Sequence, residues 1–163
     1  MSRDAKEEIE LRLAVPEDWL ALKSLLAESA SEYWTPQQLE TEFQRSASRI
    51  YLGTFREEIF GFCVMMLAAD VADVLLIAVS PRLRKRGYGS IFLRSICREM
   101  KRLGASEVCL EVRETNVAAI RLYEKVGFTQ VGKRKGYYGS DGLNAKVFRL
   151  SLTDCDLDTQ GVR

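Results

Sequence analysis

The sequence predicts a mixed α/β (α+β) fold in which helices cover both faces of one sheet. Apolar runs with strand-like alternation and amphipathic stretches with helical periodicity follow one another in mixed order. A basic, glycine-containing turn at residues 82–90 separates an apolar run from an amphipathic one, which indicates strand, turn and helix. The chain has 163 residues, of which 47% are hydrophobic, enough for one domain with a substantial core.

The first half of the chain begins with a strand, because residues 9–14 alternate apolar and polar side chains. An apolar stripe then predicts a helix from Pro16 to about Ala30. Thr35 can cap a second helix that has Pro36 at its first position. Two apolar runs joined by a short polar link predict a hairpin, and a third run predicts another strand. These three strands are expected at residues 50–54, 59–67 and 71–80.

The second half of the chain alternates helices and strands. A helix that opens at Gly87 carries an apolar face and ends at Gly104. Asn116 starts another helix, which ends at Gly127. The remaining strands are expected at residues 107–113, 128–132 and 146–152. The ends are predicted to be a flexible N-terminus at residues 1–8 and a polar C-terminal tail at residues 153–163.

Composition and charge exclude several classes of protein. The net charge of +1 gives no global argument for a nucleic-acid or membrane partner. No apolar run reaches the roughly 18 residues of a transmembrane helix, and the polar N-terminus is unlike a signal peptide, so a cytoplasmic protein is expected. The four cysteines form no C-x-x-C pair, which favours reduced thiols. Without any histidine, a general base must be Glu, Asp, Lys, Tyr, Cys or water.

The basic turn is a candidate anion site. Gly87 and Gly89 have no Cβ, so a phosphate-bearing ligand could approach the backbone at the start of the following helix. Four of the five residues 82–86 are Arg or Lys. The turn is not G-x-G-x-x-G and lacks the Gly-Lys-Ser/Thr of a P-loop, which disfavours both kinds of nucleotide site.

Three residues in the second half could carry chemistry. Glu111 interrupts an apolar strand and shares a face with Cys109 and Arg113. A partly buried carboxylate can act as a base, although spacing alone favours a solvated strand face on which Glu111 pairs with Arg113 or another neighbour. Asn116 and Tyr123 lie seven residues, or about 10 Å, apart on one helix face. One ligand could touch both, or Asn116 is only an N-cap and Tyr123 only core.

Four aromatic residues fall in predicted loops. Loop aromatics with polar tips often line binding sites, although they can also cover the edge of a core. These residues are Tyr33, Trp34, Tyr137 and Tyr138.

Taken together, these motifs resemble the GNAT superfamily of acetyl-CoA-dependent N-acetyltransferases. The family signature is a strand, Arg/Gln-x-x-Gly-x-Gly/Ala and a helix, and residues 84–89 match it. Residues 76–81, 110–128 and 134–138 are similar to one branch, the bacterial ribosomal-protein-alanine N-acetyltransferases (RimI type). The resemblance covers residues 9–152 as one acetyltransferase domain. It implies a V-shaped, splayed mixed sheet of about seven strands with four helices, in a monomer or weak dimer.

The resemblance also implies roles for individual residues. Acetyl-CoA would lie in the splay of the sheet, and no metal would be needed. Glu111 matches the family's general base and Tyr123 its general acid, for direct transfer to a protein N-terminal amine, plausibly the alanine of a small-subunit ribosomal protein. The residues expected to bind the donor are Ile77, Ala78, Val79, Arg84, Lys85, Arg86, Gly87, Tyr88, Gly89, Ser90 and Asn116. The acceptor would be flanked by Tyr33, Trp34, Tyr137 and Tyr138.

Other functions stay open at this point. The acceptor could be a lysine side chain or a small amine, and residues 139–144 depart from the branch's pattern in a region that helps to set acceptor choice. A non-catalytic acyl-CoA-binding module is a different class, but Glu111 and Tyr123 are both retained, which argues against it. A nucleic-acid binder is the weakest alternative, because its only support is one short basic turn.

Overall fold

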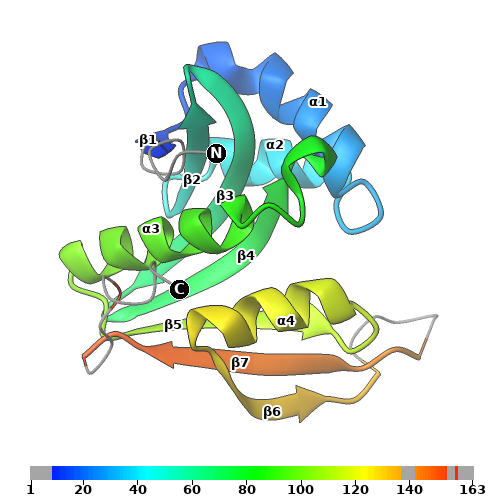
Figure 1. The fold of residues 1–163 in the computed structure, drawn as a ribbon, viewed down its shortest axis with the longest axis vertical. Coiled ribbons are helices and arrows are strands. Elements are labelled where there is room, and N and C mark those ends of the chain that lie inside the picture. The colour runs from blue at the N-terminus through cyan, green and yellow to red at the C-terminus, as the bar shows by residue number, and fades with distance from the viewer. Residues whose placement is uncertain (1–8, 137–141, 154–156, 158–163) are drawn as a thin grey trace.

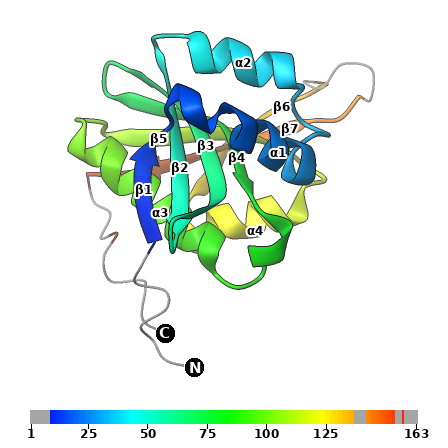
Figure 2. The same ribbon diagram turned by 90° about the horizontal axis from the view of Figure 1, so that it is seen from above.

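A computed structural model of the protein describes residues 9–136, 142–153 and 157. The strands are β1 (Ile9–Leu13), β2 (Ser48–Phe55), β3 (Glu58–Ala68), β4 (Val71–Val79), β5 (Glu107–Arg113), β6 (Thr129–Arg134) and β7 (Ala145–Ser151). The helices are α1 (Trp19–Ser29), α2 (Pro36–Gln44), α3 (Tyr88–Arg102) and α4 (Val117–Val126), with short 3-10 turns η2 (Pro16–Asp18) and η3 (Pro81–Leu83). The seven strands form one sheet, with α1 and α2 on one face and α3 and α4 on the other (Figure 2). The predicted fold class is therefore confirmed.

The elements agree with the predicted ones apart from a residue or two at their ends. One difference is that Pro16 opens a separate 3-10 turn before α1. Asp18 explains this break, because its carboxylate accepts hydrogen bonds from the Val15 N–H at 2.8 Å and from the Arg12 guanidinium at 2.8 and 2.9 Å. The hydrogen bond from Arg12 is the main cause that holds the pKa of Asp18 below its usual value. The expected cap of α2 is present, because the Thr35 side chain accepts from a backbone N–H of the first helical turn.

The sheet has the order β1-β2-β3-β4-β5-β7-β6, and only the β4–β5 pair is parallel. That pair holds only from Val71 opposite Glu107 to Val74 opposite Leu110. The antiparallel β3–β4 ladder skips Leu75, which marks a β-bulge at the point of parting. Beyond it β4 stays paired with β3, and β5 stays paired with β7, while the two strands diverge (Figure 1). The sheet is therefore split into a V, as expected.

The core consists of two clusters of buried side chains on opposite faces of the sheet. The cluster under α1 and α2 lies over β2, β3 and β4, and the larger cluster lies under α3 and α4. Phe92 of α3 is fully buried in the larger one and meets Phe60 edge-on at a centroid distance of 5.6 Å. A Cβ at Gly53 or at Gly61 would lie 2.9 or 3.3 Å from the Phe92 ring. These two glycines therefore let α3 lie close to the sheet.

The described part of the chain contains three of the four cysteines. Cys63 and Cys97 are fully buried and Cys109 is half-buried, and all three are reduced thiols outside any disulfide, as expected. Cys155 lies outside the described residues. None of the helices in the described ranges is long and apolar enough to cross a membrane.

Candidate active site

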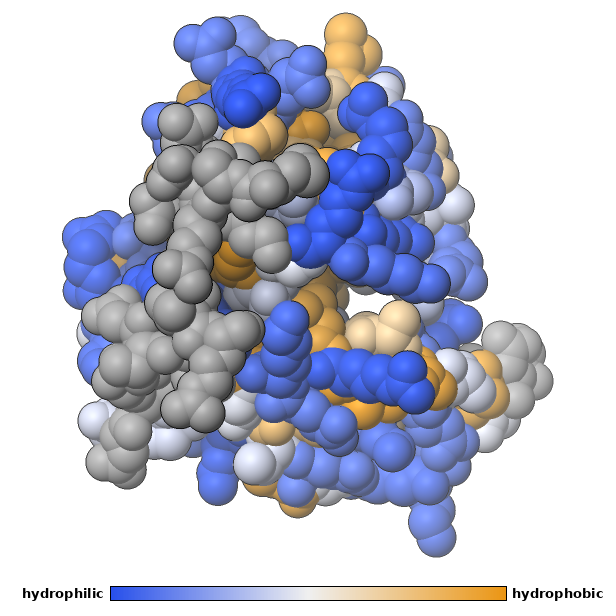
Figure 3. All heavy atoms as spheres, viewed as in Figure 1, coloured by the Kyte–Doolittle hydropathy of each residue, from blue (hydrophilic) through white to orange (hydrophobic). Residues whose placement is uncertain are grey.

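The split of the sheet opens onto the surface. Figure 3 shows a hollow between the two halves of the molecule, with hydrophilic side chains above it and hydrophobic ones below. The upper half carries the turn before α3, and the lower half carries α4 (Figure 1). The predicted site residues that the structure describes lie on the elements that border this split, namely β4, the turn before α3, β5, α4 and the loop after α1.

The turn before α3 leaves the first N–H groups of the helix without a partner inside the helix. Gly87 has a left-handed φ of 84° and forms the N-cap. The first hydrogen bond of the helix runs from the Ile91 N–H to the Gly87 carbonyl at 3.2 Å, so the N–H groups of Tyr88, Gly89 and Ser90 precede it. The buried Ser90 hydroxyl donates to the same carbonyl at 3.0 Å. The turn can therefore hold an anion with its backbone and the helix dipole.

The basic side chains of the turn divide into two groups. Arg84 donates from Nε to the Val79 carbonyl at 3.2 Å and from Nη2 to the Ser29 carbonyl at 2.9 Å. Its side chain thus ties the end of β4 to the end of α1. Lys85 and Arg86 are exposed beside the turn and can supply positive charge to a bound anion.

The last residues of β4 have one free edge. Ile77, Ala78 and Val79 pair with β3 on one side. The ladder with β5 on the other side has already ended at Val74. An extended ligand could pair with this edge as an additional strand would, while contact between these three residues and a ligand stays a prediction.

Glu111 lies on the face of β5 that the sequence predicted. Alternate residues of β5 are buried, and Glu111 shares the half-buried face with Cys109 and Arg113. Its carboxylate, 25% exposed, forms an ion pair between Oε1 and the Nε of Arg134 at 2.9 Å. The basic partner is therefore a residue of β6, two strands away, rather than the neighbour on β5. A carboxylate in this place can accept a proton from a group bound in the split.

A second carboxylate, which was not predicted from the sequence, lies on β4 next to the point where β4 and β5 part. Asp73 lies on β4 directly opposite Cys109, at the last pairs before the strands part. Burial raises the pKa of Asp73, and the charges of Glu111 and Glu107 raise it further. An aspartate inside the apolar run of residues 71–79 is the signal that could have found it.

The two predicted residues of α4 have defined structural contacts. Asn116 caps the helix, because its Oδ1 accepts from the Ala119 N–H at 3.2 Å. Tyr123 is only 6% exposed and lies between Phe128 and Phe148, at centroid distances of 6.0 and 6.3 Å. Capping and core packing are thus both present, and contact of either residue with a ligand stays a prediction.

Tyr33 connects the two halves of the molecule across the split. It comes from the loop after α1, and its hydroxyl accepts a hydrogen bond from Asn116 Nδ2 at 3.0 Å. The Arg113 guanidinium lies over its ring at 5.4 Å. Burial is the first cause that raises the pKa of Tyr33. Trp34 is half-buried against the cluster under α1 and α2, whereas Tyr137 and Tyr138 lie outside the described residues.

Polar contacts join the base of the β6–β7 connection to the start of α4. Glu114 forms an ion pair with Lys133 at 3.0 Å and accepts from Asn144 Nδ2 at 3.1 Å. The hydrogen bond from Lys133 is the first cause that lowers the pKa of Glu114. The Asn144 amide oxygen in turn accepts from the Gly136 N–H at 2.9 Å. These bonds fix both ends of the connection that contains residues 137–141.

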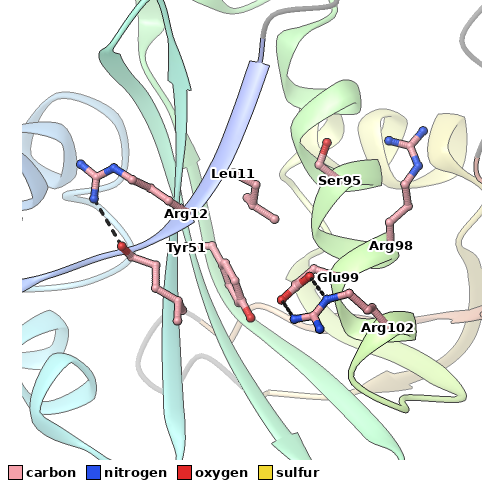
Figure 4. A pocket seen from close by; sticks show the side chains of 8 residues that line it. Leu11, Arg12, Tyr51, Ser95, Arg98, Glu99 and Arg102 are labelled. Carbon is pink, nitrogen blue, oxygen red and sulfur yellow. Dashed lines mark hydrogen bonds and ion pairs between the residues drawn. The ribbon is translucent and has the colours of Figure 1, made fainter.

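An open cavity of about 400 Å³ lies away from the split, between β1, β2 and α3 (Figure 4). Arginines at its rim are already paired, since Arg12 bonds Asp18 and Arg102 bonds Glu99. Arg98 donates to the Leu157 carbonyl at 2.8 Å. The charges around this cavity therefore serve contacts within the protein.

Comparison with known proteins decides the family. Residues 19–128 match the model of the acetyltransferase (GNAT) family. The chain belongs to this family. The GNAT fold accounts for the V-shaped sheet, so the resemblance inferred from the turn and from the following motifs is confirmed.

Individual GNAT relatives point to one branch. The chain is 34% identical over 102 residues to the [ribosomal protein bS18]-alanine N-acetyltransferase of Haemophilus ducreyi, across 61% of this chain and 70% of that protein. It resembles the crystal structure of the ribosomal-protein-S18-alanine N-acetyltransferase of Escherichia coli, with a TM-score of 0.79 and 25% identity over 91% of this chain and 96% of that one. Ard1 of Thermoplasma volcanium gives a TM-score of 0.76 and 27% identity, over 88% and 97% of the two chains. The similarity to the RimI branch is thus confirmed.

Proposed function

We propose that the protein transfers the acetyl group of acetyl-CoA to a protein N-terminal α-amine, with the N-terminal alanine of ribosomal protein bS18 as acceptor. The observation that carries this proposal is the position of Glu111 at the split between β4 and β5 in a GNAT chain. Sequence similarity to a bS18-alanine N-acetyltransferase over 61% of this chain, and structural similarity to another over 91% of it, support the acceptor. In this proposal the enzyme works in the cytoplasm without a nucleic-acid or membrane partner.

The donor site combines backbone and charge. The N–H groups of residues 86–90 would hold the pyrophosphate of acetyl-CoA, with Lys85 adding charge. The free edge of residues 77–79 would pair with the pantetheine amides. Asn116 would donate a hydrogen bond from Nδ2 to the pantetheine arm. This bond would replace the one that Nδ2 donates to the Tyr33 hydroxyl.

The reaction needs two proton transfers. A protein N-terminal amine has a pKa near 8, so Glu111 would take its proton as the nitrogen attacks the thioester carbonyl. A backbone N–H of residues 77–79 would stabilise the oxyanion while the new C–N bond forms. The C–S bond then breaks, and Tyr123 would give its proton to the departing thiolate. The cysteines take no part, because the acetyl group passes directly to the amine.

A peptide panel tests this function. Acetyl-CoA is offered with an alanine-start peptide of the bS18 sequence, the same peptide with a blocked N-terminus, and blocked peptides that contain lysine. We expect acetylation of the free peptide only, measured by mass spectrometry. Acetylation of a blocked peptide would assign lysine as the acceptor instead. Acetyl-CoA binding without turnover on any peptide or small amine would favour a non-catalytic module.

Gly87→Ala is expected to weaken acetyl-CoA binding about fivefold, because the free turn can relax away from the left-handed backbone, and restoring that backbone around the ligand costs a residue with a Cβ about 1 kcal/mol. The measurement is calorimetric titration with acetyl-CoA. Gly104→Ala is the matched control, because Gly104 has a φ of 99° at the other end of α3 and nothing lies within 4 Å of its Cβ position. Both variants should lower the melting temperature, but only Gly87→Ala should change the dissociation constant. Equal dissociation constants for acetyl-CoA in the Gly87→Ala and wild-type proteins would mean that this turn does not form part of the acetyl-CoA site.

A further inference from the structure

Arg134 reaches Glu111 across an intervening strand. It ends β6 opposite Ala145 of β7, and Glu111 on β5 lies opposite Val147 of the same strand. Two strand spacings of about 4.8 Å separate β6 from β5, yet Arg134 Nε lies 2.9 Å from Glu111 Oε1. Gly132 occupies the β6 position in the row of Glu111 and has no side chain to obstruct this path.

Glu111 lies among charges of both signs. Among the described residues, the charged and titratable groups on this side of the sheet are Asp73 from β4, Glu107, Cys109 and Arg113 from β5, Arg149 from β7, Arg134 from β6, and Tyr33 from the loop after α1. Glu107 has its own arginine, since Arg149 Nε lies 3.6 Å from its carboxylate. Neighbouring negative charges disfavour an ionised carboxylate, and a neighbouring cation favours it. Arg134 is the cation that the structure places on Glu111.

We propose that Arg134 is a positioning residue for the acetyl transfer: its ion pair keeps Glu111 ionised and holds one carboxylate oxygen, so that the other is available to the acceptor amine. A general base must be ionised before it can accept a proton. A guanidinium 2.9 Å from one carboxylate oxygen favours the ionised form of the side chain and leaves the other oxygen for the amine. The inference rests on the proposed role of Glu111. In this arrangement Arg134, at the end of β6, holds Glu111 ready to accept a proton, although Arg134 does not itself react.

The test is the pH dependence of kcat/KM with the alanine-start peptide. In the pH profile of kcat/KM, the amine of the peptide gives an inflection, or limb, near pH 8 that is the same for every variant. Ionisation of the base gives a second limb at lower pH. Arg134→Gln is expected to move this lower limb upward by about one pH unit, and therefore to lower kcat/KM about tenfold below it. Arg134→Lys restores the positive charge and should return the limb most of the way.

Arg149→Gln is the matched control. It removes a charge that lies opposite Cys109, two residues or roughly 7 Å along the strand from Glu111, but whose ion pair is with Glu107. Because the ion pair of Arg149 is with Glu107, the lower limb should move much less than in Arg134→Gln. An unmoved limb in Arg134→Gln, or an equal movement in Arg149→Gln, overturns the inference.

Two further measurements distinguish loss of the Arg134–Glu111 ion pair from damage to the fold and from a wrong assignment of the base. The Arg134 side chain is 59% exposed at an edge strand, so Arg134→Gln should fold, and thermal melting checks this. The Michaelis constant for acetyl-CoA should not change, whereas general damage to the fold would raise it. If Glu111→Gln keeps full activity, the proposed base is wrong. If Glu111→Gln is inactive while Arg134→Gln leaves the limb unmoved, only the inference about Arg134 fails.

Discussion

Glu111→Gln is expected to lower kcat/KM for the alanine-start peptide by about 10²–10⁴-fold at pH 7. The amide keeps the shape of the side chain at the split of the sheet, but it cannot accept the proton of the attacking amine. The rate is followed as release of the free thiol of coenzyme A. Affinity for acetyl-CoA should stay within about twofold, because the donor site uses other residues.

The defect should also depend on pH in a defined direction. As the pH rises through about 8, the acceptor amine loses its proton without help, so the ratio of wild-type to Glu111→Gln rates should fall. Glu107→Gln is the matched control, because Glu107 lies on the same face of β5 and also pairs with an arginine. It should retain activity within about twofold. Wild-type rates for Glu111→Gln would show that water or another group removes the proton.

The sequence predicted those features that depend on neighbours in the chain. Alternation along residues 107–113 placed Glu111 on a half-buried face, and the glycine turn placed helix N–H groups beside an apolar strand. Asn116 was recognised as an N-cap from the residues that follow it. Each of these follows from a local period or a local cap, which a sequence records directly.

The contacts that connect the halves of the site could not be predicted in this way. Asn116 and Tyr33 are 83 residues apart, and they meet only because the split sheet brings two loops together. Arg134 faces Glu111 because β7 inserts between β5 and β6, an order that no local pattern records. Long-range register and strand order determine these pairs, so they require the folded structure.

Arg84, in the turn before α3, also makes long-range contacts that local sequence patterns could not predict. The family signature assigned its charge to the ligand, whereas its guanidinium bonds the Val79 and Ser29 carbonyls. Ser29 ends α1, where unpaired carbonyls and the negative end of the dipole favour a cation. Arg84 therefore fixes the turn against β4 and α1, and in the proposed function the exposed basic neighbours of Arg84 supply charge to the ligand.

Phe92→Ala is expected to lower the free energy of unfolding by about 3–5 kcal/mol. The ring is fully buried, meets Phe60 edge-on and lies over Gly53 and Gly61, whose missing side chains cannot fill the space it would leave. Urea unfolding measures the change. Leu20→Ala is the control, since Leu20 is 72% exposed on α1 and its loss should cost less than about 0.5 kcal/mol.

Acetyl-CoA should restore much of the stability that Phe92→Ala loses. A ligand present at 100 times its dissociation constant stabilises the native state by about 2.7 kcal/mol if it binds only that state. We expect the conformation of the turn before α3 not to depend on Phe92. Arg84 ties this turn to β4, and the hydrogen bond from the Ile91 N–H to the Gly87 carbonyl starts the helix locally. We therefore expect the variant to gain nearly the full amount, as the wild-type protein does. A much smaller gain would mean that the packing of α3 against the sheet determines the geometry of the turn at its N-terminus. Core packing and acetyl-CoA binding would then be energetically coupled.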